Sequence, residues 1–313
     1  MKPSIPIYLL TGYLGSGKTT LLKNTLSYFS HIGKKAAVIM NEVGEINVDG
    51  YSLETDTPVA EILGGCICCS VSGDLKNTII QVCEDYTPDV IIIESTGVAL
   101  PRDTISAITE ASLYIEVELK SNVTVIDAHY LLELMENKGR TYQMIKEQIF
   151  YGDILILNKM DRVPSEKISE LKNTIHHWNS NAVIQTTTHC KVSFDFLDET
   201  ISRSNPIKPL GSSKHSSHNH VMVYTHYFDR PIERQTFEDL IKTLPQTIYR
   251  AKGILHFKDT NGPMVFQYAY KELEMIRMTA KSELTNVAVF IGERFSKEKL
   301  IKLIEEHFVI KHD

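Results

Sequence analysis

The sequence lacks a long apolar run, which argues against a protein that spans a membrane with helices. Its most apolar stretch near the start, Ile5–Leu10, is far shorter than the roughly 20 residues that a spanning helix needs. This stretch leads into a glycine-rich loop rather than into the small-residue cleavage site of a signal peptide. We therefore expect no membrane partner and a cytoplasmic protein.

An excess of basic residues is also absent. The chain carries 33 Lys and Arg against 39 Asp and Glu, which gives a formal net charge of −6. Proteins that bind nucleic acid usually present a basic face to the phosphates. We therefore expect no nucleic-acid partner.

Cysteines are few and poorly placed for disulfides. There are five, an odd number, and Cys68 and Cys69 are adjacent, so a regular disulfide framework is not expected. Cys66, Cys68 and Cys69 all fall within the segment Gly64–Cys69. Clustered thiols in a chain without a secretory signal indicate metal binding or redox activity.

Short apolar, β-branched runs alternate with amphipathic stretches over residues 7–186. The predicted strands are Ile7–Thr11, Ala36–Met40, Val90–Ile93, Val123–Ile126, Ile154–Leu157 and Ala182–Thr186, and the predicted helices are Thr19–Phe29, Leu75–Cys83 and Tyr142–Phe150. This order predicts an α/β fold with a mostly parallel sheet covered by helices on both faces. In such folds the functional residues lie at the carboxyl ends of the strands.

A change in composition divides the chain. Residues 202–220 are rich in Ser, Pro and His and have no apolar period, so we interpret them as a linker between a domain at 1–201 and a second domain at 221–313. The predicted elements of the second domain are strand Val221–Phe228, helix Arg230–Leu244, strands Ile248–Phe257, Met264–Tyr270 and Val287–Ile291, and helix Ser296–Phe308. This order predicts a smaller α+β domain with an antiparallel sheet.

The segment Gly12–Thr19 matches the phosphate-binding P-loop pattern, with a predicted strand before it and a predicted helix after it. Its glycines let backbone N–H groups converge on phosphate oxygens at the positive end of the helix. Lys18 would reach the β- and γ-phosphates, and the Thr19 hydroxyl would bind Mg²⁺. The predicted phosphate-side residues are Gly12, Gly15, Ser16, Gly17, Lys18, Thr19 and Thr20. The alternative is an ordinary glycine-rich turn.

The segment Asn158–Asp161 follows a predicted strand and reads Asn-Lys-Met-Asp. The Asp161 carboxylate would accept hydrogen bonds from the guanine N1–H and exocyclic amine, which adenine does not offer. Alone, these residues are a common polar loop. Together with a P-loop, Asn158, Lys159 and Asp161 predict a guanine-binding site.

The segment Glu94–Gly97 stands at the end of another predicted strand. An acidic residue here is expected to hold Mg²⁺, directly or through water, and Gly97 would offer its N–H to the γ-phosphate. The alternative is a carboxylate that caps the following helix.

Thiolates are preferred ligands of zinc and similar metals, and structural zinc sites usually have four ligands. Cys66, Cys68 and Cys69 supply at most three, which suits a metal that arrives and leaves. The alternatives are a Cys66–Cys68 redox pair and simple packing of buried thiols. Glu42 is a candidate further ligand, or a residue that holds a water near the γ-phosphate.

Other candidates carry less information. We interpret Cys83 as a core residue, and Cys190 beside His189 indicates little. His215, His218 and His220 lie in the linker, where weak metal binding and an incidental polar tract are equally good interpretations.

Taken together, these motifs resemble the CobW family of P-loop GTPases. The resemblance rests on Gly12–Thr19, Asn41–Glu45, Gly64–Cys69, Glu94–Gly97, Asn158–Asp161, the histidine-bearing linker and Phe290–Gly292. It implies a P-loop NTPase fold of the GTPase type, with a smaller α+β carboxyl-terminal domain. It also implies GTP hydrolysis coupled to the delivery of a transition metal, usually zinc or cobalt, to a client protein.

We therefore hypothesise a slow GTPase metallochaperone. Lys18, Glu42 and Glu94 would carry the catalysis, with GTP, Mg²⁺ and Zn²⁺ or Co²⁺ as its ligands. Its partners would be guanine nucleotide and a client metalloprotein, and the sequence leaves a homodimer open. The alternative classes are a nucleotide-binding metal sensor or buffer, and an ATP-dependent small-molecule kinase, which the segment Asn158–Asp161 disfavours.

Overall fold

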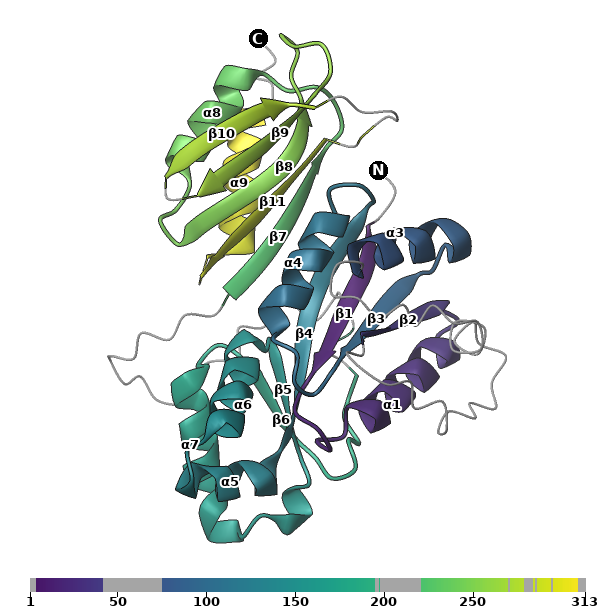
Figure 1. The fold of residues 1–313 in the computed structure, drawn as a ribbon, viewed down its shortest axis with the longest axis vertical. Coiled ribbons are helices and arrows are strands. Elements are labelled where there is room, and N and C mark those ends of the chain that lie inside the picture. The colour runs from purple at the N-terminus through teal and green to yellow at the C-terminus, as the bar shows by residue number, and fades with distance from the viewer. Residues whose placement is uncertain are drawn as a thin grey trace.

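The computed structural model describes residues 4–41, 75–194, 197, 221–269, 271–278, 284, 286–293 and 295–308, and within them the chain forms two separate β-sheets (Figure 1). Residues 5–186 contribute the first sheet and residues 221–293 the second. The predicted linker falls outside the described residues. In the described ranges, no helix is both long and apolar enough to cross a bilayer.

The first sheet is parallel and has the strand order β2-β3-β1-β4-β5-β6. Its strands are β1 Ile5–Thr11, β2 Ala36–Asn41, β3 Val90–Ser95, β4 Val117–Asp127, β5 Ile154–Asn158 and β6 Val183–Thr186. All six predicted runs are confirmed as strands. However, β4 begins at Val117 rather than at the predicted Val123, because its first residues pair with the start of β1.

Helices cover both faces of this sheet (Figure 1). They are α1 Lys18–His31, α3 Leu75–Tyr86, α4 Pro101–Ala111, α5 Ala128–Glu136, α6 Arg140–Tyr151 and α7 Ile168–Trp178. Tyr8 and Leu10 pack with α1, whereas Ile7 and Leu9 pack with α3 and α4 on the opposite face. Because successive strand residues point to opposite faces, two-sided burial explains the uninterrupted apolar runs.

The second sheet is antiparallel, with the strand order β10-β9-β8-β11-β7. Its elements are β7 Val221–Phe228, α8 Arg234–Thr243, β8 Ile248–His256, β9 Pro263–Ala269, β10 Glu272–Arg277, β11 Asn286–Glu293 and α9 Lys297–Phe308. Phe237 of α8 and Leu300 of α9 pack on one face, against Phe266 and Phe290. The prediction of an antiparallel sheet is confirmed.

Two details of this region differ from prediction. Helix α8 begins at Arg234 rather than Arg230, because Ile232 bridges Phe257 and donates its N–H to His256 O at 2.9 Å, which keeps the preceding backbone extended. Strand β10 was not predicted. It is a largely exposed edge strand in which only Leu273 and Met275 pack against the core, so its apolar pattern is short.

The other face of the second sheet contacts the first part of the chain just after α4. Leu113 packs against Ile254, Val287 and Val289. The Tyr227 hydroxyl on β7 accepts a hydrogen bond from Val117 N–H at 3.1 Å and lies 3.1 Å from Val117 O. Helix α4 itself follows the segment Glu94–Gly97, and its Glu110 pairs with Lys252 of β8 at 3.5 Å, so the second sheet also contacts this helix.

We predict that Tyr227→Phe lowers the free energy of unfolding by about 1 kcal/mol, because it removes a partly buried hydrogen bond between the two parts of the chain. Chemical denaturation of the full chain would measure the change. Tyr249→Phe is the matched control, since Tyr249 is 43% exposed on strand β8 of the same sheet. Equal stabilities of the two variants would contradict the role of Tyr227.

Candidate functional site

The loop between β1 and α1 is closely packed, and two of its glycines have no room for a side chain. Gly12 has a φ of 134°, and an added Cβ would overlap Val125 O. Gly17 has a φ of 116° and precedes α1, and an added Cβ would come within 2.5 Å of Asn158 Nδ2. Both positions have a positive φ that favours glycine. The loop therefore leaves its backbone and the start of α1 uncovered by glycine side chains, an arrangement that fits an anion.

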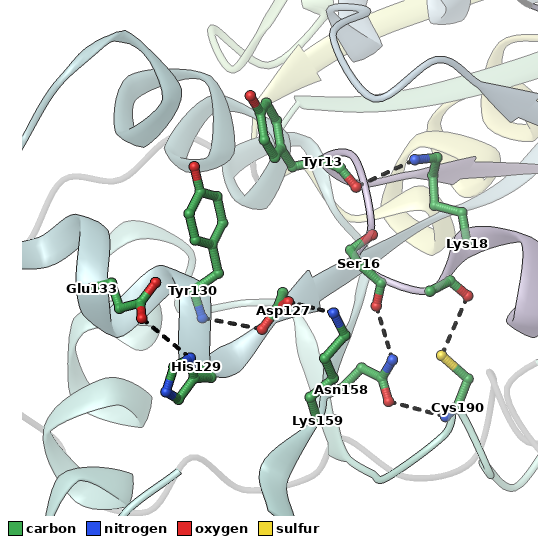
Figure 2. A network of polar contacts seen from close by, with 11 residues as sticks. Tyr13, Ser16, Lys18, Asp127, His129, Tyr130, Glu133, Asn158, Lys159 and Cys190 are labelled. Atoms are coloured by element: carbon green, nitrogen blue, oxygen red, sulfur yellow. Dashed lines mark hydrogen bonds and ion pairs between the residues drawn. The ribbon is translucent and has the colours of Figure 1, made fainter. Parts of the chain in front are cut away.

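The Lys18 ammonium is held inside this loop. Lys18 is buried, and its Nζ donates to Gly12 O at 2.9 Å. It also donates to Tyr13 O at 3.3 Å (Figure 2). Ser16 is also buried, and its Oγ has no hydrogen-bond partner among the described residues. A buried hydroxyl without a partner is costly, so a ligand that accepts its hydrogen bond would be stabilising here. Both side chains fit a phosphate.

Thr19 and Glu94 come together from the start of α1 and the end of β3. The Thr19 hydroxyl donates to Glu94 Oε1 at 3.3 Å, and Glu94 is buried. A hydroxyl and a carboxylate at this separation are the oxygen ligands that Mg²⁺ prefers beside phosphates. The arrangement therefore fits the predicted magnesium site, and the residues predicted for it, Thr19 and Glu94, do lie together.

The segment Glu94–Gly97 packs directly against the P-loop. A Cβ on Gly97 would lie 2.6 Å from Leu14 N, so only a glycine allows this approach. Behind Gly97, the buried Gln148 on α6 donates from Nε2 to Gly97 O at 3.1 Å. Sequence analysis missed Gln148, because a glutamine within an amphipathic helix carries no pattern that marks it as buried.

Asn158 joins the predicted base-binding motif, Asn158–Asp161, to the P-loop. Its Nδ2 donates to Ser16 O at 2.8 Å, and its Oδ1 accepts from Cys190 N–H at 3.0 Å (Figure 2). The Cys190 thiol donates to Gly17 O at 3.4 Å, and burial raises the pKa of this thiol to about 11, so it keeps its proton. The structure gives Cys190 a packing position that its sequence context did not indicate.

The remaining predicted nucleotide residues lie at the same edge of the sheet. Asp161 is exposed in a short 3-10 helix, Met160–Arg162, directly after β5, and Thr20 is exposed in the first turn of α1. The Lys159 ammonium pairs with Asp127 at 2.6 Å. Asp127 was missed by sequence analysis, although it stands directly after a predicted strand, where the other motifs were found.

The residues predicted to bind a transition metal differ from the magnesium pair in lying outside the described parts of the chain. Glu42, Cys66, Cys68, Cys69, His215, His218 and His220 all lie outside the described residues. Within the described ranges, no three His, Cys, Asp or Glu side chains gather into a group that could hold a metal ion. Cys83 is buried in the core, as predicted, where burial raises the pKa of its thiol to about 11.

Comparisons with known proteins cover most of the chain. Residues 6–186 match the family model of the CobW/HypB/UreG nucleotide-binding domain, and residues 221–307 match that of the cobalamin synthesis protein CobW C-terminal domain.

Among similar proteins, the zinc chaperone YjiA of Escherichia coli is 27% identical over 95% of this chain and 96% of its own length. The zinc-regulated GTPase metalloprotein activator 1 of Schizosaccharomyces pombe is 28% identical over 88% of this chain and 78% of its own. The zinc chaperone CobW of a Sinorhizobium species is 29% identical, but the match spans only 55% of either chain. The crystal structure of Zn(II)-bound YjiA GTPase from E. coli aligns with a TM-score of 0.48 at 23% identity, over 98% of this chain and 99% of that one.

We predict that Gly17→Ala destabilises the nucleotide-free protein by about 2–4 kcal/mol, from the strain of a positive φ together with overpacking against Asn158 and Cys190. Gly15→Ala is the matched control. Gly15 also has a positive φ, 71°, but nothing lies within 4 Å of an added Cβ, so only strain of about 1–2 kcal/mol is expected. Denaturant unfolding without nucleotide would separate the two, and equal losses would contradict the close packing of the loop.

Proposed function

The chain belongs to the CobW/HypB/UreG family of nucleotide-binding proteins, and on this premise we propose that it is a GTP-hydrolysing metallochaperone that delivers a transition metal, zinc, to a client protein. One observation carries the nucleotide part of the proposal. Asn158 of the base-binding motif bonds to Ser16 of the P-loop, and Thr19 of the same loop bonds to Glu94. Three motifs far apart in sequence therefore form one site. The names of the relatives as zinc chaperones and as a zinc-regulated GTPase support the metal part.

GTP would bind with its phosphates along Gly12–Thr19 and its base at Asn158–Asp161. Lys18 would exchange its two carbonyl partners for β- and γ-phosphate oxygens, a stronger interaction because both groups are charged. Asp161 would accept the two guanine N–H donors. Thr19 and Glu94 would hold Mg²⁺, which neutralises charge on the phosphate oxygens.

Hydrolysis would proceed by attack of a water oxygen on the γ-phosphorus. The bond from that phosphorus to the β,γ-bridging oxygen breaks, leaving GDP and inorganic phosphate. Lys18 would stabilise the charge that develops on the leaving oxygen, so the chemistry depends on positioning and charge rather than on a covalent intermediate. In this proposal Glu42 holds the attacking water.

The metal would bind Cys66, Cys68 and Cys69 and be released when the nucleotide changes. The γ-phosphate would order Gly97 and the chain from Glu42 to Cys69, and its loss would loosen them, as in the order–disorder switching of GTPases. The close packing of Gly97 against Leu14 supports the first step of this coupling, because it brings the segment Glu94–Gly97 into contact with the phosphate loop. The client would dock partly on the second sheet.

The nucleotide chemistry is tested by Glu94→Gln, which keeps an oxygen for the Thr19 hydroxyl but removes the charge that would bind Mg²⁺. We predict a fall in the GTP hydrolysis rate of about 100-fold, and a higher Mg²⁺ concentration at half-maximal rate. ATP should be hydrolysed far more slowly than GTP by the wild type. Glu84→Gln, on the exposed side of α3, is the control for loss of a carboxylate. An unchanged Mg²⁺ requirement in Glu94→Gln would refute the magnesium assignment.

The metal cycle is tested by titrating Zn²⁺ into the full chain with GDP and with a non-hydrolysable GTP analogue. We expect zinc affinity to differ at least about tenfold between the two nucleotides, the size of a typical coupling between sites. Cys66→Ser should lose both the affinity and the difference, whereas Cys83→Ala, a change in the core, should keep them. Equal zinc affinities with GDP and with the GTP analogue would contradict the metal cycle and favour a metal buffer.

A further inference from the structure

Asp127 ends β4 at the position next to the base-binding motif. In the parallel pairing of β4 with β5, Asp127 is the register partner of Asn158, the first residue of that motif. Its carboxylate therefore lies beside the residue that follows, Lys159. The ion pair between Lys159 Nζ and Asp127 Oδ2 measures 2.6 Å, and the two side chains are only 27% and 16% exposed. Partial burial reduces the screening that weakens ion pairs at the surface.

Lys159 also has an unusual backbone. Its φ is 61°, in the left-handed region that non-glycine residues rarely adopt. This turn redirects the chain from β5 into the short helix Met160–Arg162, which carries Asp161. Left-handed residues persist where the surroundings hold them, and such residues cluster at ligand sites. The ion pair with Asp127 holds the Lys159 side chain at this turn, and the backbone bond from Met160 N–H to Thr187 O, 3.2 Å, holds the next residue.

The second oxygen of Asp127 has a different partner. Oδ1 accepts from Tyr130 N–H at 3.0 Å and so caps the start of α5. The Tyr130 ring stacks on Tyr13 of the P-loop, with ring centroids 5.9 Å apart (Figure 2). One carboxylate thus ties together the start of α5, the base-binding turn and, through Tyr130, the phosphate loop.

We propose that Asp127 is a positioning residue for guanine recognition, which acts by holding Lys159 and the left-handed turn so that Asp161 meets the base. This assignment adds a residue to the proposed GTPase site, and it rests on the proposed GTPase function. Asp127 does not itself contact the nucleotide in this assignment. Asp127 would therefore affect the affinity for GTP and the discrimination between bases rather than the rate of hydrolysis. The groups that act on the phosphates, Lys18, Thr19 and Glu94, are held by other contacts.

The test variant is Asp127→Asn. The asparagine Oδ1 still accepts from Tyr130 N–H, so the cap of α5 is kept, while the amide Nδ2 faces the Lys159 ammonium as a donor facing a donor. Asp127→Ala would remove the cap as well and is less informative. Glu133→Gln is the matched control, since Glu133 lies on α5, the helix that Asp127 caps, and pairs with His129 at the surface. It removes the same charge nearby without touching the turn.

The decisive measurement compares GTP with inosine triphosphate, whose base lacks the 2-amino group from which Asp161 would accept a hydrogen bond. We expect Asp127→Asn to raise KM for GTP about tenfold, with a much smaller change in kcat, and to shrink the GTP preference over inosine triphosphate by at least about threefold. Asp127→Glu should restore part of the preference. Glu133→Gln should behave as wild type.

The outcomes distinguish a failure of the Asp127 assignment from a failure of the proposed GTPase function. A wild type that prefers GTP over ATP, together with an unchanged base preference in Asp127→Asn, overturns the role of Asp127 and leaves the proposed function standing. A wild type without guanine preference overturns both. An equal loss of affinity for GTP and inosine triphosphate, accompanied by a lower unfolding temperature, also overturns the role of Asp127, because it would mark a structural residue only.

Discussion

The close approach of three loops around Asn158 is the constraint on which the candidate site depends. The Asn158 side chain has one NH₂ donor group and one oxygen acceptor. The NH₂ group donates to the backbone of the P-loop, and the oxygen accepts from the backbone N–H of Cys190. A buried amide that satisfies both groups fixes the distance between the loops, since leaving either group unsatisfied is costly. Gly17 is required by the same geometry, because a side chain there would meet Asn158 and Cys190.

The parallel sheet explains why these loops meet at all. With β1 between β3 and β4, the chain segments that leave the carboxyl ends of the strands gather at one edge. The P-loop leaves β1, Glu94–Gly97 leaves β3, and Asn158–Asp161 leaves β5. Thr19 and Glu94 are thereby hydrogen-bonded although 75 positions separate them. Ser16 and Asn158 are hydrogen-bonded across 142 positions.

The stretch of chain from Gly97 to Val117 connects this edge of the parallel sheet with the antiparallel sheet. Gly97 packs on the P-loop, α4 follows it, and Leu113 and Val117 beyond α4 contact the second sheet through Val289 and Tyr227. The same stretch of chain therefore contacts both the phosphate loop and the second sheet. In the proposed function, a displacement at the phosphate loop would pass along these packed elements to the second sheet.

The sequence by itself determined the parts of the molecule that local pattern encodes. Two-sided burial makes strands such as Val90–Ile93 continuous apolar runs, and backbone chemistry makes Gly12–Thr19 recognisable, so the first sheet, the P-loop and the pairing of Thr19 with Glu94 were predictable. Tertiary structure alone decided the roles of Asp127, Gln148, Cys190 and Tyr227. Each acts through a contact with a residue between 32 and 110 positions away, and no local period or motif records such a partner. The start of α8 was likewise set by the bridge from Ile232 to Phe257, where tertiary pairing overrode the helical signal around Pro231.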